Sequence, residues 1–186
     1  VAATRASLTY TGDASNQVTD DATFTLEGNL GTADFTVTAG DALSDVAAEI
    51  NRNSHSTGVT AAVDTDAHTL TLTSVDYGSD TEVSVDVSSG TFAVTGGNGD
   101  GTANGTDVEA RINGINYTGE GNRVTVNQAG SHFEIRFAEG FAGELDPITA
   151  SGPVPTFALW PDSTRQSSLA VPGVLGFCIW TGASAS

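Results

Sequence analysis

Apolar residues between Leu30 and Val63 change from a spacing of two to a helical spacing and back again. In the centre, four apolar residues stand at i, i+3, i+4 and i+7 and so share one helical face. They are Leu43, Val46, Ala47 and Ile50. Asp41 stands just before them, where its carboxylate can accept hydrogen bonds from the free N–H groups of a first helical turn. The pattern predicts a short helix near 41–53, capped by Asp41.

Strands are predicted on both sides of this helix. Phe35 and Val37 alternate with polar residues before it, and Val59, Ala61 and Val63 alternate after it. Alternation with a period of two gives a strand one apolar and one polar face. A helix of this length is marginal alone and needs an apolar surface to cover. We therefore predict a strand–helix–strand unit in which the helix lies on a sheet.

Further alternating segments predict short strands along most of the chain. They are centred on Ala6–Thr11, Ala22–Glu27, Leu70–Leu72, Val83–Val87, Val108–Ile112, Val124–Val126 and Phe133–Phe137. Asn113-Gly114 separates two apolar alternations, and Asn-Gly accepts positive φ at both positions of a hairpin turn. These elements predict an α+β fold that is mostly β. It has small antiparallel sheets with one short helix packed on a sheet, followed by a small β domain.

Composition divides the chain into four parts. Residues 96–105 read GGNGDGTANG and predict a flexible linker. This linker separates a β/α unit at 1–95, which holds the helix, from a small β-hairpin domain at 106–150. All five prolines lie from Pro147 onward, and proline removes a ladder donor and fixes φ. The segment 151–186 is therefore predicted as an extended tail rich in proline and aromatic residues, either degenerate or non-native.

Two stretches of the sequence resemble a known family. FTVTAGDALSDVAAEIN, followed by TGVTAAVD and LTLTSVDYGSDTEVSV, resembles the repeat in the variable middle region of bacterial flagellins. The same repeat occurs in filament-cap and hook-associated proteins. GTDVEARINGINYTGEGNRVTV, at Gly105–Val126, resembles the "ING" segment that follows this repeat in many flagellins. The chain is thus similar to the variable outer-domain region of a flagellin.

This resemblance implies a structural protein of the bacterial flagellum, an extracellular organelle of motility. It implies a surface-exposed outer domain whose subunits polymerise with other flagellin subunits through long terminal helices. The chain contains no heptad pattern or long helical pattern, so those helices are predicted to be absent from it. Filament-cap or hook-associated proteins are the alternative in the same class. An adhesin-like binding module is the alternative in another class, and a concave cluster of aromatic side chains, with Tyr77 and Tyr117, would mark it.

Charge and apolar content exclude several partners. The formal net charge is −17 and the chain has no lysine, so its field repels nucleic acid and anionic membranes. No apolar run is long enough to span a bilayer. The one cysteine, Cys178, provides no disulfide framework. We predict neither a nucleic-acid partner nor a membrane partner.

Candidate chemistry is sparse. His55, His68 and His132 are scattered without the spacing of metal ligands. The carboxylate pairs Asp20/Asp21 and Asp64/Asp66 are predicted to be solvated loop residues, because a glycosidase pair needs a cleft. The linker stretch Asn98–Gly101 lacks the ligand spacing of an EF-hand, and a plain connector is favoured over a calcium loop.

No nucleophile elbow or phosphate-binding loop is present either. We therefore predict no catalytic residue, no metal and no cofactor, and a protein that is not an enzyme. Asn104 in Asn-Gly-Thr and Asn116 in Asn-Tyr-Thr fit the acceptor pattern for N-glycosylation.

Overall fold

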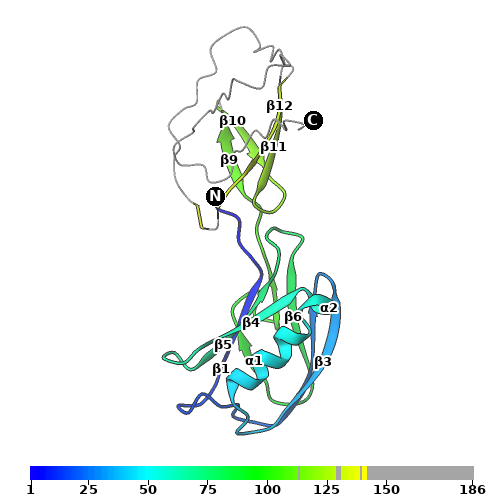
Figure 1. The fold of residues 1–186 in the computed structure, drawn as a ribbon, viewed down its shortest axis with the longest axis vertical. Coiled ribbons are helices and arrows are strands. Elements are labelled where there is room, and N and C mark those ends of the chain that lie inside the picture. Colours follow the sequence, from blue (N-terminus) through cyan, green and yellow to red (C-terminus); the bar gives the residue numbers. More distant parts are fainter. Residues whose placement is uncertain (113, 129–130, 139, 142–186) are drawn as a thin grey trace, which may run out of the picture.

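The computed structural model of the protein describes residues 1–112, 114–128, 131–138 and 140–141 (Figure 1). Two four-stranded antiparallel sheets form its larger part. The first sheet has the order β4-β5-β1-β7. Its strands are β1 (Ser7–Thr11), β4 (Val59–Asp64), β5 (Thr69–Ser74) and β7 (Val94–Thr95). Leu8 and Tyr10 of β1 lie opposite Leu72 and Leu70 of β5, and all four are buried. The alternating pattern thus places one apolar face of this sheet in the core.

The second sheet has the order β3-β2-β6-β8. Its strands are β2 (Ala22–Gly28), β3 (Gly31–Val37), β6 (Glu82–Gly90) and β8 (Thr102–Asn104). Strand β2 is central, and its Phe24 and Leu26 are fully buried. The pairing of β2 with β6 shifts register between Thr23 and Phe24, a local irregularity of the kind that increases twist in antiparallel sheets.

A column of stacked aromatic rings joins the two sheets. Tyr10 of β1 lies on Phe92 with ring centroids 4.1 Å apart, and Phe92 lies on Phe24 at 4.3 Å. Phe35 of β3 continues the column from Phe24 at 5.6 Å. The rings come from both sheets and from the segment before β7, so the column fixes the sheets against each other. Large apolar rings of this kind dominate core energetics.

The predicted helix is present as α1 (Leu43–Arg52), followed by the single turn α2 (Ser54–Thr57). Its four buried residues are the predicted ones: Leu43, Val46, Ala47 and Ile50. The helix packs mainly against β4, beside which it lies in Figure 1. The flanking strands β3 and β4, however, belong to different sheets. The helix therefore lies on a sheet, as predicted, but its two flanking strands are divided: β4 pairs with β5 in the first sheet, and β3 pairs with β2 in the second.

The prediction that Asp41 caps the helix is wrong. Ala42 occupies the capping position and makes no side-chain hydrogen bond. The Asp41 carboxylate instead accepts from the Thr38 N–H at 2.8 Å. The first-turn N–H of Leu43 donates to the Asn16 carbonyl at 2.9 Å. A loop that is distant in sequence satisfies this donor, so the carboxylate is free to close its own turn.

Asn51 fastens the end of α1 to the edge of the first sheet. Its side-chain Nδ2 donates to the Ala61 carbonyl at 2.8 Å, and its Oδ1 accepts from the Ala61 N–H at 2.9 Å. Ala61 lies in β4, which is an edge strand. The amide therefore takes the place that a neighbouring strand would occupy and blocks edge pairing at that point.

Replacing Asn51 by Leu is expected to lower the free energy of unfolding by about 1–3 kcal/mol, because the N–H and C=O of Ala61 both lose their partner. Chemical denaturation followed by circular dichroism measures the change. Asn53→Leu is a control, since the Asn53 amide donates only to the exposed end of α1 at the Glu49 carbonyl. An Asn51 variant as stable as the Asn53 variant would contradict the role assigned to this amide.

A second, smaller core follows the first along the chain. Its strands are β9 (Glu109–Ile112), β10 (Ile115–Thr118), β11 (Arg123–Gln128) and β12 (Ser131–Arg136). They form two hairpins, β9–β10 and β11–β12. The fully packed side chains are Ala3, Val108, Val124 and Val126. At the turn predicted from Asn113-Gly114, Ile112 pairs with Ile115 and Gly114 has a φ of 81°.

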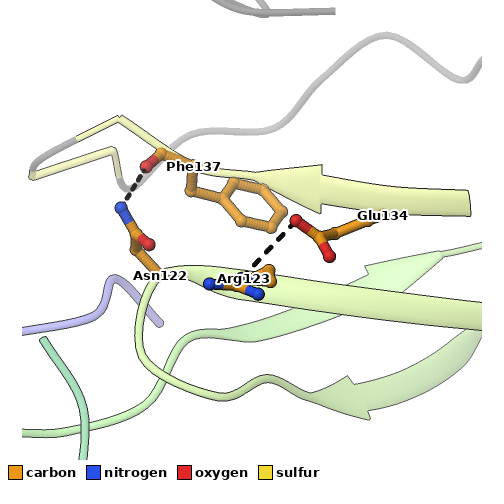
Figure 2. Close-up of polar contacts among 4 residues, drawn as sticks. All are labelled: Asn122, Arg123, Glu134 and Phe137. Carbon is orange, nitrogen blue, oxygen red and sulfur yellow. Dashed lines mark hydrogen bonds and ion pairs between the residues drawn. The ribbon is translucent and has the colours of Figure 1, made fainter.

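Polar contacts hold the ends of β11 and β12 together (Figure 2). The Asn122 amide donates to the Phe137 carbonyl at 3.1 Å, and Arg123 Nε lies 3.5 Å from Glu134 Oε1. Both charged side chains are about half exposed, at 46% and 47%. An exposed ion pair of this kind contributes little to stability, so Val124 and Val126 hold this hairpin in place.

The fold class is confirmed: the protein is mostly β, with small antiparallel sheets and the helix α1 packed on one of them. The segment 96–105, predicted as a linker, contributes β8 to the second sheet, where Ala103 is buried against the first core. No helix in the described part of the chain is long and apolar enough to cross a membrane. Trp160, Phe177, Cys178, Trp180 and the rest of the predicted tail lie outside the described residues.

Candidate functional site

The region between the two cores holds a group of polar contacts that connect segments far apart in sequence. Here the N-terminal segment runs antiparallel to the segment that follows β8 (Figure 1). The Thr4 N–H donates to the Thr106 carbonyl at 2.9 Å, and the Thr106 N–H donates back at 3.2 Å. The two hydroxyls lie 2.8 Å apart. We call this region, with Tyr77–Ser79, Asp107 and Gly121, the joint.

Asp107 is the centre of the joint. Its Oδ2 accepts from the Ser79 hydroxyl at 2.5 Å, and its Oδ1 accepts from the Ser79 N–H at 3.1 Å. Oδ1 also accepts from the Gly121 N–H at 2.7 Å. Ser79 belongs to the loop before β6 in the larger core, whereas Gly121 belongs to the turn before β11 in the smaller one. One carboxylate therefore ties both cores together.

These hydrogen bonds change the acidity of Asp107. The hydrogen bond from the Ser79 hydroxyl lowers the pKa of the Asp107 carboxyl from its usual value, burial opposes this effect, and the N–H groups of Gly121 and Ser79 lower the pKa further. Hydrogen bonds to a carboxylate favour its charged form. The joint is therefore complete at neutral pH.

A cation and an aromatic ring close the other side of the joint. The Arg5 guanidinium lies over the Tyr77 ring, 4.4 Å from its centroid. Tyr77 in turn packs against the smaller core. Among the described residues, Arg5 Nε is the one buried side-chain nitrogen or oxygen without a hydrogen-bond partner. The ring thus provides the main favourable contact for this charge.

Acid is expected to weaken the joint. Because the folded pKa of Asp107 is lowered, its contribution to stability is fully present above the pKa of the unfolded state and is lost as the pH falls through the folded pKa. Asp107→Asn should lower the free energy of unfolding at pH 7 by about 1 kcal/mol, a value reduced for partial exposure. Denaturation at several pH values measures the difference. If the difference between the two proteins stayed constant down to strong acid, the carboxylate would not be its source.

The two predicted glycosylation residues lie apart. Asn104 ends β8, where its Nδ2 donates to the Thr81 carbonyl at 3.5 Å and its Oδ1 accepts from Asn98 Nδ2 at 3.1 Å. Asn116 lies in β10 and is exposed. Within the described residues, Asn116 has no side-chain hydrogen bond.

The three histidines are separated as predicted. His55 lies in α2, His68 bonds Asn16 at 2.9 Å, and His132 bonds Asn127. No group of three or more His, Cys, Asp or Glu side chains gathers to hold a metal in the described part of the chain.

The carboxylate pairs act in turns. Asp64 Oδ1 accepts from the N–H groups of Asp66 and Ala67 in the β4–β5 hairpin, and Asp21 Oδ1 accepts from the Ala39 N–H. In the loop considered for calcium, Asp100 Oδ1 accepts from the Thr102 hydroxyl at 2.5 Å, and this bond lowers the pKa of the Asp100 carboxyl. One oxygen each of Asp64, Asp21 and Asp100 thus has a backbone or hydroxyl donor.

A groove of about 290 Å³ lies between α1 and β3. Its ionisable lining consists of Asp41, Asp45, Glu49 and Arg52, and the lining includes no His, Cys or Ser. Tyr77 and Tyr117, the aromatic residues considered for a binding surface, both pack against the smaller core.

Sequence reasoning missed the joint. Asp107, Ser79 and Arg5 stand in three separate segments, and no spacing signal links them. The available signal for tight turns here was glycine: Gly78 precedes Ser79 in sequence, and the Gly121 N–H bonds Asp107. Both glycines have positive φ, which glycine permits. The Ser79 hydroxyl and the Gly121 N–H both donate to the Asp107 carboxylate, so these contacts connect the two cores.

Comparison with known proteins places these elements in context. The family model described as "Flagellin hook IN motif" matches residues 23–76, which run from β2 through α1 to the segment after β5. No curated protein matches the chain significantly. A crystal structure of FliD (HAP2) from Pseudomonas aeruginosa PAO1 is similar, with 17% identity, a TM-score of 0.48, and coverage of 74% of this chain and 76% of that one. The chain therefore carries a flagellin hook IN motif over residues 23–76, as its resemblance to flagellin repeats predicted.

Proposed function

We propose that this chain is a surface-exposed outer domain of a flagellin subunit in the bacterial flagellar filament. The observation that carries this proposal is the flagellin hook IN motif over residues 23–76. That segment supplies both central core elements, β2 and α1. In this role the protein is structural, extracellular and not an enzyme. It joins other flagellin subunits through long helices that lie outside this chain.

The joint supports a mechanical role. An outer domain stands in moving solvent, so the two cores should keep a fixed relative position. The hydrogen bonds that Asp107 accepts and the Thr4–Thr106 bridge connect the cores at several points. We infer that the unit with the motif and the small β domain at 106–150 act as one stiff projection.

The alternatives are a domain of a filament-cap or hook-associated protein and an adhesin-like binding module. Immunogold labelling with antibody raised against this chain, applied to flagella of the bacterium that encodes it, separates these readings. Label along the whole filament is expected for a flagellin. Label confined to the filament tip or hook would favour a cap or hook-associated protein. Label on the cell surface without flagella would favour an adhesin and overturn the proposal.

Made alone, the chain is expected to be a soluble monomer or weak associate. Its charge of −17 causes like-charged copies to repel each other, and its longest described helix is α1. Sedimentation at low and high salt measures the state, and electron microscopy checks for filaments. A helical polymer formed by this chain alone would contradict the expectation.

Glycan attachment at Asn104 or Asn116 stays a proposal. Asn116 is the better acceptor, because its amide is exposed in β10, whereas the Asn104 amide is engaged by Thr81 and Asn98. Intact-mass and glycopeptide analysis of protein from the native bacterium tests both. Occupancy at Asn104 with none at Asn116 would contradict this order.

A further inference from the structure

Two Asn-Gly dipeptides occur close together in the described part of the chain. Asn98-Gly99 lies in the loop before β8, and Asn104-Gly105 lies at the end of β8. Asn-Gly is the dipeptide most open to attack on its own side chain, because glycine places no side chain beside the backbone nitrogen. The two sites have very different surroundings in the structure.

The reaction needs only water. The backbone nitrogen of the glycine attacks Cγ of the asparagine, loses its proton to solvent, and forms the fifth bond of a succinimide ring. The Cγ–Nδ2 bond breaks, and Nδ2 leaves as ammonia after taking a proton. Water then opens the ring on either side. One opening gives aspartate, and the other gives isoaspartate, in which the backbone passes through Cγ. No oxidant or cofactor takes part.

Gly99 is free to make this attack. Asn98 and Gly99 are both exposed, and a Cβ added to Gly99 would meet no atom within 4 Å. Within the described residues, neither the Gly99 N–H nor Asn98 Oδ1 has a hydrogen-bond partner. The two bonds of the Asn98 side chain use Nδ2, which donates to Thr102 Oγ1 at 3.2 Å and to Asn104 Oδ1 at 3.1 Å. These bonds leave Cγ and Oδ1 of the Asn98 side chain without a contact that would block attack at Cγ.

Gly105 is held in place instead. Its N–H donates to the Thr81 carbonyl at 3.1 Å, and the residue is buried. A Cβ at Gly105 would lie 2.5 Å from the Gly78 carbonyl oxygen and 2.6 Å from that of Thr4. The nitrogen must therefore break a buried hydrogen bond and move against packed backbone before it can reach Cγ of Asn104.

We propose that Asn98 is a site of spontaneous deamidation in the folded protein, and that Asn104 is protected by the joint. Conversion at Asn98 removes the Nδ2 donor that holds Thr102 and Asn104, and it adds a negative charge two residues from Asp100. Isoaspartate also lengthens the backbone at the residue whose N–H donates to the Thr102 carbonyl. The turn into β8 is thereby loosened as the protein ages.

Peptide mapping tests the proposal in the intact chain. Cleavage before aspartate divides the chain at Asp86, Asp100 and Asp107, so Asn98, Asn104 and Asn113 fall on separate peptides. The folded chain is incubated at mildly alkaline pH, and each peptide is followed by mass spectrometry and isoaspartate methyltransferase labelling. Asn98 is expected to convert at least about tenfold faster than Asn104. Equal rates, or faster conversion at Asn104, would overturn the proposal.

The same incubation in concentrated urea provides the control. Unfolding removes the Gly105 hydrogen bond, so the two rates are expected to converge there. A difference that persists unchanged in urea would come from the neighbouring sequence, and it would overturn the protection assigned to the joint. Gly99→Ala adds a Cβ beside the attacking nitrogen in open space. This variant should slow the deamidation of Asn98 and leave the deamidation rate of Asn104 unchanged. An unchanged rate at Asn98 would refute attack by this nitrogen.

Discussion

Phe24→Ala is expected to lower the free energy of unfolding by about 3–5 kcal/mol, the range for a buried aromatic residue replaced by alanine. Phe24 is fully buried in β2 and lies within the hook IN motif. Its ring stacks on Phe92 at 4.3 Å and on Phe35 at 5.6 Å. Removing it leaves a cavity at the middle of the column that joins the two sheets. Urea denaturation followed by far-ultraviolet circular dichroism measures the loss.

A matched control for this variant lies in the smaller core. Phe133 is only partly buried in β12, so Phe133→Ala should cost less than Phe24→Ala. If Phe24→Ala fails to fold, Phe24→Leu keeps most of the volume and is expected to cost about 1 kcal/mol. Equal losses for the two alanine variants would show that the column is not the main support of the larger core.

Gly78→Ala is expected to lower the free energy of unfolding by about 2–4 kcal/mol and to open the joint. Gly78 has a φ of 115°, in the region that favours glycine. A Cβ there would lie 2.6 Å from Asp107 Oδ1 and 2.8 Å from the Gly121 Cα. Strain and overlap therefore act together, and the Asp107 carboxylate has to move. Denaturation gives the energy, and small-angle X-ray scattering shows whether the cores separate.

Gly40→Ala separates the two causes. Gly40 also has positive φ, at 93°, but its added Cβ would meet no atom within 4 Å. This control should cost about 1 kcal/mol from backbone strain alone and leave the scattering profile unchanged. A Gly78 variant that matched the Gly40 variant in both measurements would show that contact with Asp107 and Gly121 does not constrain the joint.

Local periodicity predicted much of the fold, because a helix buries apolar residues three or four positions apart, whereas a strand buries every second residue. Leu43, Val46, Ala47 and Ile50 face the core as their spacing predicted. The hairpin at 113–114 also follows from its Asn-Gly turn and from the alternation on both sides. The candidate site was harder to predict from the sequence. Of its residues, only Tyr77 was singled out from the sequence, and for a binding role.

The sequence by itself determined which residues form the helix and strands, which of their faces are apolar, and the flagellin-type motif in 23–76. These are properties of neighbours along the chain. Only the tertiary structure decided that β3 and β4 enter different sheets, that Asn16 replaces Asp41 at the start of α1, and that Asp107 joins the two cores. The physical reason is that each of these features depends on hydrogen-bond partners far away in sequence. A local pattern does not specify which distant donor or acceptor a group will bond.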